Sequence, residues 1–94
     1  MLYVISCTDK PDHGHVRQEN RPRHLDYLQG HGDAVRLAGP YISDDGETVL
    51  GSLIVVDVAD RAGAEAIAAG DPYAEAGLFA DVKISAFRCA IGEL

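Results

Sequence analysis

Apolar segments with two different periodicities alternate along this chain, and their order limits the folds that it can form. Four runs rich in apolar residues have the character of strands, and two further stretches carry apolar residues at helical spacing. In chain order the segments cover residues 2–8 (strand), 16–29 (helix), 34–38 and 48–58 (strands), 61–69 (helix) and 81–90 (strand). The β-α-β-β-α-β order predicts an α+β fold of the ferredoxin-like type with an antiparallel sheet.

The strand over residues 48–58 is apolar on both of its faces, so both faces should be covered. In the predicted fold both helices cover one face, and the other face would expose a large apolar patch. A single domain over residues 1–94 also has a modest core, for which oligomerisation is an expected supplement. We therefore expect a homodimer packed sheet to sheet, which is a dimeric α+β barrel.

Several local signals refine these elements. Asp60 is placed to cap the second helix. Pro22 lies inside the first helix and removes one backbone donor, which predicts a kink or a split into two pieces. Gly39-Pro40 is expected to close the second strand with a turn, and Gly51 marks either a close approach or a bulge within a strand.

The charge balance narrows the classes of partner. The chain carries 8 Lys and Arg against 15 Asp and Glu, a formal net charge of −7. A nucleic-acid-binding protein needs cations to neutralise phosphates, and an anionic membrane surface attracts basic segments. We therefore expect no nucleic-acid partner and no membrane association, and a small molecule is the expected ligand.

The cysteines and the first residues bear on the cellular compartment. Cys7 and Cys89 are the only cysteines, and the apolar run Met1-Leu2-Tyr3-Val4-Ile5 is too short for a signal peptide and has no basic residues before it. We therefore expect a reduced, cytoplasmic protein in which both cysteines are small buried strand residues, rather than a disulfide.

His24 and Asp71 are the residues most able to carry chemistry. They lie 47 positions apart, so only folding could bring them together. A carboxylate that orients an imidazole is a common way to build a general acid or base. The ordinary alternative is a histidine at a helix edge and an Asp-Pro turn after a helix.

Further polar residues could serve the same site. If the first helix is unbroken, Arg17, Arg21 and His24 fall on one stripe, and the arginines could hold an anionic substrate. Tyr73 could donate a proton or form a hydrogen-bonding wall, and Ser6 could help Arg21 to stabilise developing negative charge. The alternative is that the arginines are solvated and the tyrosine is half-buried with a wet hydroxyl.

The segment Asp12-His13-Gly14-His15 could contribute metal ligands, with His31 or Asp33 as additional donors. The spacing matches no recognised metal motif, so a solvated loop is the alternative that the pattern favours. The chain has no P-loop, no G-x-G-x-x-G, no nucleophile elbow and no C-x-x-C. We therefore expect no metal and no cofactor.

Two motifs give the chain a family resemblance. Residues 21–28 read R-P-R-H-L-D-Y-L and residues 71–78 read D-P-Y-A-E-A-G-L. Together with residues 1–5, Ala38-Gly39-Pro40 and Gly51-Ser52, they closely resemble the YCII-related (YciI-like) proteins over nearly the whole chain.

The resemblance implies a dimeric α+β barrel, related in fold to muconolactone isomerases and small monooxygenases. It also implies an active site with a His–Asp pair, here His24 and Asp71. One branch of the family is associated with dehydrochlorination of chlorinated hydroxyquinols. We therefore expect a cofactor-independent acid–base enzyme, a lyase or isomerase. The alternatives are a non-catalytic module that binds a small ligand and, with less support, a metal enzyme that uses His13 and His15.

Overall fold

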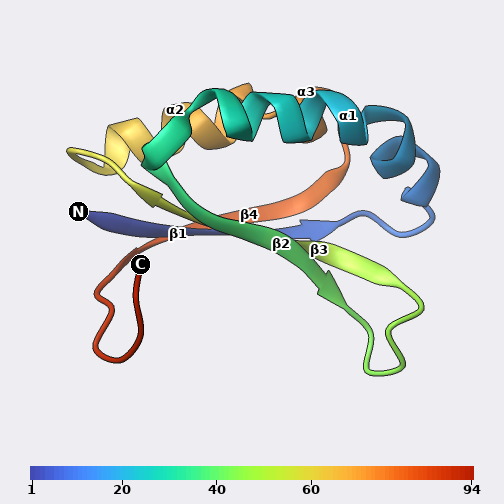
Figure 1. Ribbon diagram of the computed structural model, residues 1–94. Helices are drawn as coiled ribbons and strands as arrows, with labels where there is room; N and C mark the ends of the chain where they lie inside the picture. Colours follow the sequence, from blue (N-terminus) through green and yellow to red (C-terminus); the bar gives the residue numbers. More distant parts are fainter.

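The computed structural model describes all 94 residues and contains one four-stranded antiparallel sheet, in the order β2-β3-β1-β4. The elements are β1 (Leu2–Asp9), α1 (Gly14–Gly30), the short 3₁₀ helix η1 (Gly32–Ala34), β2 (Val35–Ile42), β3 (Val49–Asp57), α2 (Arg61–Gly70), α3 (Pro72–Glu75) and β4 (Phe79–Phe87). Figure 1 shows all three α-helices above one face of the sheet. The predicted ferredoxin-like α+β fold is therefore confirmed.

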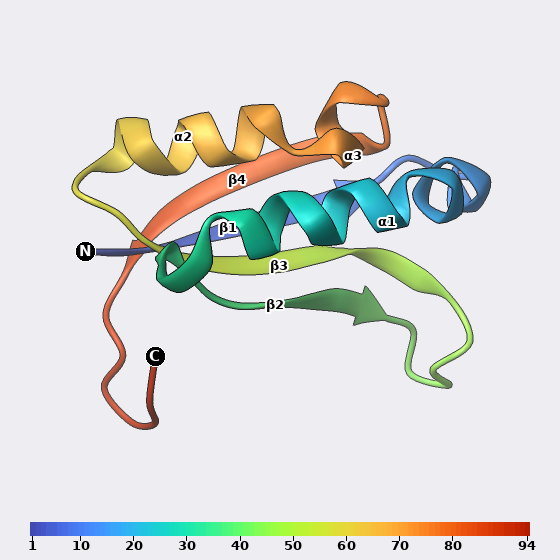
Figure 2. The ribbon, with the colours of Figure 1, turned by 45° about the horizontal axis from the view of Figure 1, so that its top comes forward.

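The core lies between the sheet and the two long helices, which run side by side above it (Figure 2). Alternate residues of β1 point into it: Tyr3, Ile5 and Cys7 are at most 6% exposed. Their partners across β3 include Val56 and Ile54, which are also buried. The helices contribute Leu28, Ala64 and Ile67 to the same cluster.

Helix α1 is continuous from Gly14 to Gly30, although Pro22 lies inside it. The proline therefore does not split the helix in two. Pro22 is exposed, and so is Gln18, whose carbonyl loses its usual donor. Solvent can hydrogen-bond that carbonyl, which explains why the loss of one helical hydrogen bond is tolerated here. An unbroken helix leaves Arg17, Arg21 and His24 on one stripe, as the spacing predicts.

The boundaries of two strands differ from the prediction. Strand β2 runs through Gly39-Pro40, which is therefore not a turn. Because β2 is an edge strand, Pro40 can pair with Ser52 without interrupting a ladder on its other side. Strand β4 covers Phe79–Phe87 instead of residues 81–90, and its first residue pairs with Asp9 across a register shift in β1.

The cysteine prediction is half correct. Cys7 is buried in β1, whereas Cys89 lies in the tail that follows β4 and is only half-buried. Both cysteines are free. Figure 1 shows this tail hanging below the sheet, on the side away from the helices.

Two glycine and capping predictions are confirmed. Asp60 caps α2, because its side chain accepts a hydrogen bond of 3.0 Å from the backbone N–H of Gly63. Gly51 marks a close approach: a Cβ atom there would lie 2.0 Å from the carbonyl oxygen of Cys7. No helix combines the length and the apolar character needed to cross a membrane.

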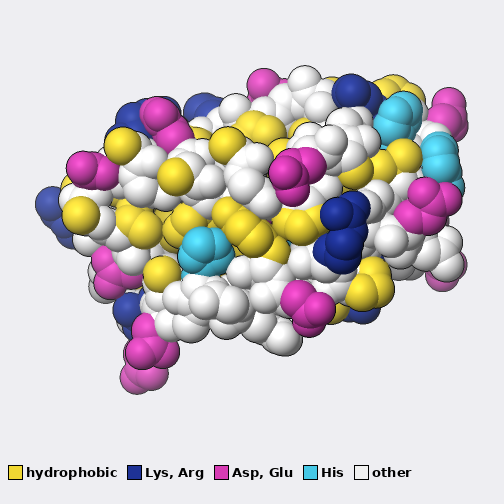
Figure 3. Space-filling view, turned by 90° about the horizontal axis from the view of Figure 1, so that it is seen from above, with side chains coloured by type: hydrophobic (Ala, Val, Ile, Leu, Met, Phe, Trp, Pro, Cys, Tyr) yellow, Lys and Arg dark blue, Asp and Glu magenta, His cyan; other side chains and the backbone are white.

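The second face of the sheet has no helix over it, and we call it the open face. The pairing register places on it the apolar residues Leu2, Val4, Leu37, Tyr41, Leu53, Val55 and Phe87. Leu37 and Tyr41 are each 40% exposed and Phe87 is 44% exposed. The helix side looks different: Figure 3 shows its hydrophobic side chains interrupted by charged and histidine side chains.

Candidate active site

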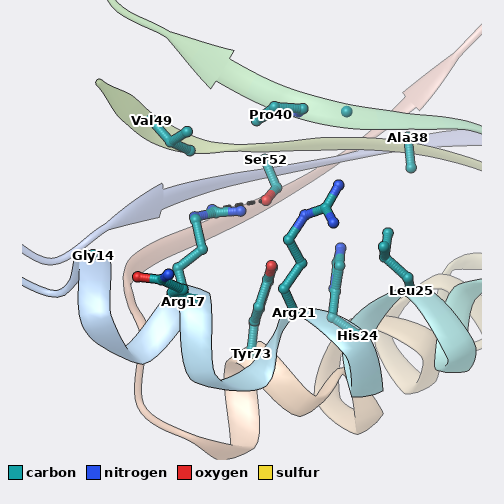
Figure 4. A pocket seen from close by; sticks show the side chains of 12 residues that line it. Gly14, Arg17, Arg21, His24, Leu25, Ala38, Pro40, Val49, Ser52 and Tyr73 are labelled. Carbon is teal, nitrogen blue, oxygen red and sulfur yellow. Dashed lines mark hydrogen bonds between the residues drawn. The ribbon is translucent and has the colours of Figure 1, made fainter. Parts of the chain in front are cut away.

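The fold brings His24 of α1 against Asp71, the residue that joins α2 to α3. The Nδ1 atom of His24 lies 2.8 Å from Oδ1 of Asp71, and the two residues are only 7% and 2% exposed. A carboxylate only accepts hydrogen bonds, so this contact assigns the hydrogen to Nδ1 when Asp71 is ionised. The other ring nitrogen, Nε2, has no protein partner and points into a cleft (Figure 4). The pair thus leaves one imidazole lone pair facing that cleft.

Asp71 also performs the ordinary turn role. Its Oδ1 atom accepts a hydrogen bond of 2.9 Å from the backbone N–H of Tyr73, so it caps α3, and Pro72 occupies the first turn. The two readings of the Asp-Pro sequence are therefore compatible. The second oxygen, Oδ2, is buried and accepts no hydrogen bond. A buried oxygen without a hydrogen bond lowers the stability of the fold. Unfavourable features of this kind are common at functional sites.

Tyr73 forms one wall around the histidine. Its ring stacks on the His24 ring with centroids 3.9 Å apart and an interplanar angle of 11°. Burial raises the pKa of Tyr73, and the positive charge of Arg17 only partly opposes this effect. The phenol therefore keeps its hydrogen at neutral pH and can act as a donor.

Arg17 lies on the other side of Tyr73, with its guanidinium carbon 4.7 Å from the ring centroid. It donates two hydrogen bonds of 2.8 Å to the carboxylate of Asp9 and one of 3.0 Å to Oγ of Ser52. Burial is the largest single influence and would lower the pKa of Arg17, but the hydrogen bonds to Asp9, the charge of Asp9 and the contribution of Tyr73 together raise that pKa. Arg17 is thus a fixed, charge-balanced part of the wall and not a solvated side chain.

The cleft has a volume of about 380 Å³ and lies between α1, β2, β3 and the start of α3. Its polar lining includes Arg17, Arg21, His24, Ser52 and Tyr73, all labelled in Figure 4. No Asp or Glu lines it. A cleft of this size suits a small organic molecule.

Three predicted residues, His24, Arg21 and Tyr73, therefore line one cleft with Asp71 behind them. Ser6 does not: it lies on the open face, where its hydroxyl is 2.9 Å from the hydroxyl of Tyr41. The reason is strand alternation, since Ser6 follows the inward-facing Ile5.

Two residues of the site, Ser52 and Asp9, are not predicted from the sequence. Ser52 is a polar residue at an inward position of the most apolar strand, two residues before the buried Ile54. That break in the apolar alternation is a signal that could have identified it. Asp9 had no comparable signal, because its pairing with Arg17 depends on how β1 leads into α1.

His13, which precedes α1, and His15, in the first turn of α1, do not line this cleft. The rings of His13 and His15 have centroids 6.0 Å apart, and Nδ1 of His13 lies 2.7 Å from the carbonyl oxygen of Pro11. The structure contains no group of three or more His, Cys, Asp or Glu side chains that could hold a metal ion. His31 and Asp33 do not complete such a group.

These features define a class: a small α+β protein of ferredoxin-like fold whose helix-covered cleft has a buried His–Asp pair in its wall. The family model of the YCII-related domain matches residues 1–88. The chain belongs to this family.

Curated relatives support this assignment. Protein YciI from Escherichia coli O6:H1 and Protein YciI from Shigella flexneri are each 36% identical to the chain, over 94% of this chain and 97% of theirs. An uncharacterised protein from Haemophilus influenzae is 35% identical with the same coverage.

A solved structure has the same fold. It is 5-chloro-2-hydroxyhydroquinone dehydrochlorinase (TftG) from Burkholderia phenoliruptrix, in complex with 2,5-dihydroxybenzoquinone. It superposes with a TM-score of 0.85 at 26% identity and covers 94% of each chain. The resemblance to YciI-like proteins and the predicted fold type are thus confirmed.

Proposed function

We propose that this protein is a cofactor-independent acid–base enzyme that acts on a small oxygenated ring or carbonyl compound. One observation carries the proposal: a buried imidazole whose Nδ1 bonds to Asp71 at 2.8 Å while its Nε2 faces a cleft of about 380 Å³. This arrangement holds the ring in one tautomer and one orientation, as a general base requires.

The chemistry follows from the tautomer. His24 Nε2 takes a proton from the substrate, and the electron pair left behind forms a new double bond. In an elimination the leaving group departs with its own bonding pair; in an isomerisation His24 returns the proton to another atom. Asp71 stabilises the imidazolium while it exists. Arg21 and Tyr73 line the same cleft and stabilise the negative charge on substrate oxygen.

The relative of similar structure supports the reaction class. That protein is a dehydrochlorinase in complex with a dihydroxylated quinone. Loss of hydrogen chloride is an elimination, which needs a base and no external electron acceptor. We extend to this chain only the class, a lyase or isomerase step on a cyclic oxygenated molecule.

The test is turnover of a panel of chlorinated hydroxyquinols, quinols and lactones. We expect His24→Gln and Asp71→Asn each to lower turnover by roughly 10²–10⁴-fold. The control is His15→Gln, an exposed histidine on the same helix. Circular dichroism should show that all three variants are folded. Turnover retained in both site variants would contradict the proposal.

The second candidate function is a non-catalytic module that binds a small ligand. The observation in its favour is that Asp71 has a structural role as the cap of α3, which alone explains its place. This candidate predicts that members of the panel bind to the cleft and are recovered unchanged. The acid–base proposal predicts consumption of at least one of them.

We also propose that the protein works as a homodimer joined through the open face. Leu37, Tyr41 and Phe87 are each at least 40% exposed there, and no helix covers them. A second copy of the same face would bury this surface and yield the α+β barrel.

We place the protein in the cytoplasm, which suits two free cysteines.

A further inference from the structure

Ser52 is a cleft residue with a hydrogen-bonding capacity that the protein leaves unused. It lies on β3 and is 3% exposed, and its side chain points down toward the helices (Figure 4). Its Oγ atom receives a hydrogen bond of 3.0 Å from Arg17. A guanidinium can only donate, so the serine oxygen must be the acceptor in this bond.

The hydroxyl hydrogen of Ser52 is therefore directed elsewhere. The hydroxyl of Ser52 donates no hydrogen bond within the protein, and Ser52 lines the cleft. Arg17 is itself held by two bonds to Asp9, so its bond to Oγ occupies one lone pair of the serine and favours a hydroxyl hydrogen that points away from Arg17. A nearly buried donor without a partner favours a ligand that brings an acceptor atom.

The charges around the cleft select the kind of acceptor. Asp9 balances the charge of Arg17, while Arg21 has no carboxylate partner. The chain has 15 Asp and Glu residues and a net charge of −7, yet none of these carboxylates lines the cleft. A positive pocket in an acidic protein attracts an anion and repels a cation.

We infer that Ser52 is a ligand-binding residue, and that the cleft takes a small organic anion whose carboxylate, phenolate or enolate oxygen accepts from Ser52 and pairs with Arg21. This inference deepens the proposed function, because it names the substrate class of the same cleft. His24 Nε2 is an acceptor, so the ligand meets donors at its charged oxygen and an acceptor at its acidic hydrogen.

The test uses benzoate and benzamide, which have nearly the same shape but differ in charge. Binding to the full chain is measured by NMR titration. We expect benzoate to bind at least roughly tenfold more tightly than benzamide. Ser52→Ala and Arg21→Gln should each weaken benzoate binding roughly tenfold, because each removes a hydrogen bond to a charged group. Both should weaken benzamide binding less, because its neutral carbonyl oxygen forms a weaker hydrogen bond than a carboxylate does.

Two further variants serve as controls. Ser6→Ala removes a serine from the open face and should leave benzoate binding unchanged. Ser52→Thr keeps the hydroxyl and should retain most of the affinity, which separates loss of the donor from a disturbed fold. Benzoate binding no tighter than benzamide, or equal benzoate affinity in Ser52→Ala and the wild type, would overturn the inference. Turnover that depends on His24 would survive that result, so the two proposals fail separately.

Discussion

The two faces of the sheet differ in the kind of side chain that each one buries or exposes. On the helix-covered side of the sheet lie four buried polar residues, Asn20, His24, Ser52 and Asp71. On the open face large apolar side chains such as Leu37 and Phe87 reach solvent. A monomer selected for stability alone would show the reverse distribution. The contrast is what we expect if the cleft on the covered face binds the proposed ligand and the open face packs against the proposed second copy.

Charged groups show the same contrast. The pair of Arg17 and Asp9 on the covered face has side chains only 12% and 9% exposed. The pair of Arg36 and Asp57 has a longer separation of 3.6 Å and side chains 38% and 44% exposed. Because the two ion pairs differ in burial, we expect their removal to lower the free energy of unfolding by different amounts.

The largest loss of stability is expected for Asp9→Asn, which leaves the guanidinium of Arg17 nearly buried without its carboxylate. We expect the free energy of unfolding to fall by about 4 kcal/mol. Arg36→Gln is the control and should lower it by less than about 1 kcal/mol. Urea unfolding of both variants measures the difference. Equal losses would show that the two pairs have the same environment.

The next effect concerns Gly51, where β3 approaches β1. An alanine Cβ would lie 2.0 Å from the Cys7 carbonyl oxygen, so the strands must shift. We expect Gly51→Ala to lower the free energy of unfolding by about 3 kcal/mol. Gly39→Ala is the control, because nothing lies within 4 Å of the added atom. A similar stability in the two variants, measured by urea unfolding, would contradict the close approach.

The open face is tested by adding a charge to it. Leu37→Glu should raise the dissociation constant of the dimer roughly 30-fold, about 2 kcal/mol, because the carboxylate must be desolvated at the interface. Analytical ultracentrifugation measures the constant. Ala66→Glu places the same charge on the exposed side of α2 and should leave it unchanged. A wild-type protein that is monomeric at all concentrations would refute the proposed homodimer.

The smallest effect, when stability is compared within about one pH unit above pH 9, is a pH dependence on the covered face. Burial, reinforced by the charges of Asp71 and Asp9, raises the pKa of Cys7 from 9.0 to about 12. Above about pH 9 the unfolded chain loses this proton while the folded chain keeps it, so stability falls as pH rises toward about 12. The free energy of unfolding should therefore decline more steeply in the wild type than in Cys7→Ala. Equal slopes would mean that Cys7 has no such shift.

The sequence predicted the architecture because the strand and helix patterns are local. It mispredicted the ends of strands where pairing decided the outcome. Gly39-Pro40 has the composition of a turn, but pairing with β3 keeps both residues in an edge strand. The start of β4 at Phe79 depends on a register shift near Asp9, which no pattern in the final strand reveals.

Only part of the candidate site was predicted, because the contacts within it join residues that are far apart in the sequence. Spacing left the pairing of His24 and Asp71 open, and the family motifs gave the stronger reason to expect it. Ser6 was predicted to serve the site, but side chains alternate along β1, so Ser6 points to the open face while its neighbour Ile5 points to the covered face. The role of Ser52 depends on a bond from Arg17, 35 positions away in the sequence. Bonds over such a separation follow from the fold and not from local pattern.

The central claim is that Asp71 holds His24 with Nδ1 protonated and Nε2 free as an acceptor in the cleft. The most direct measurement is ¹⁵N NMR of the imidazole, which distinguishes the two tautomers. We predict the Nδ1–H tautomer in the wild type and a mixture of tautomers in Asp71→Ala. An Nε2–H tautomer in the wild type, or a spectrum that does not change in Asp71→Ala, would contradict it.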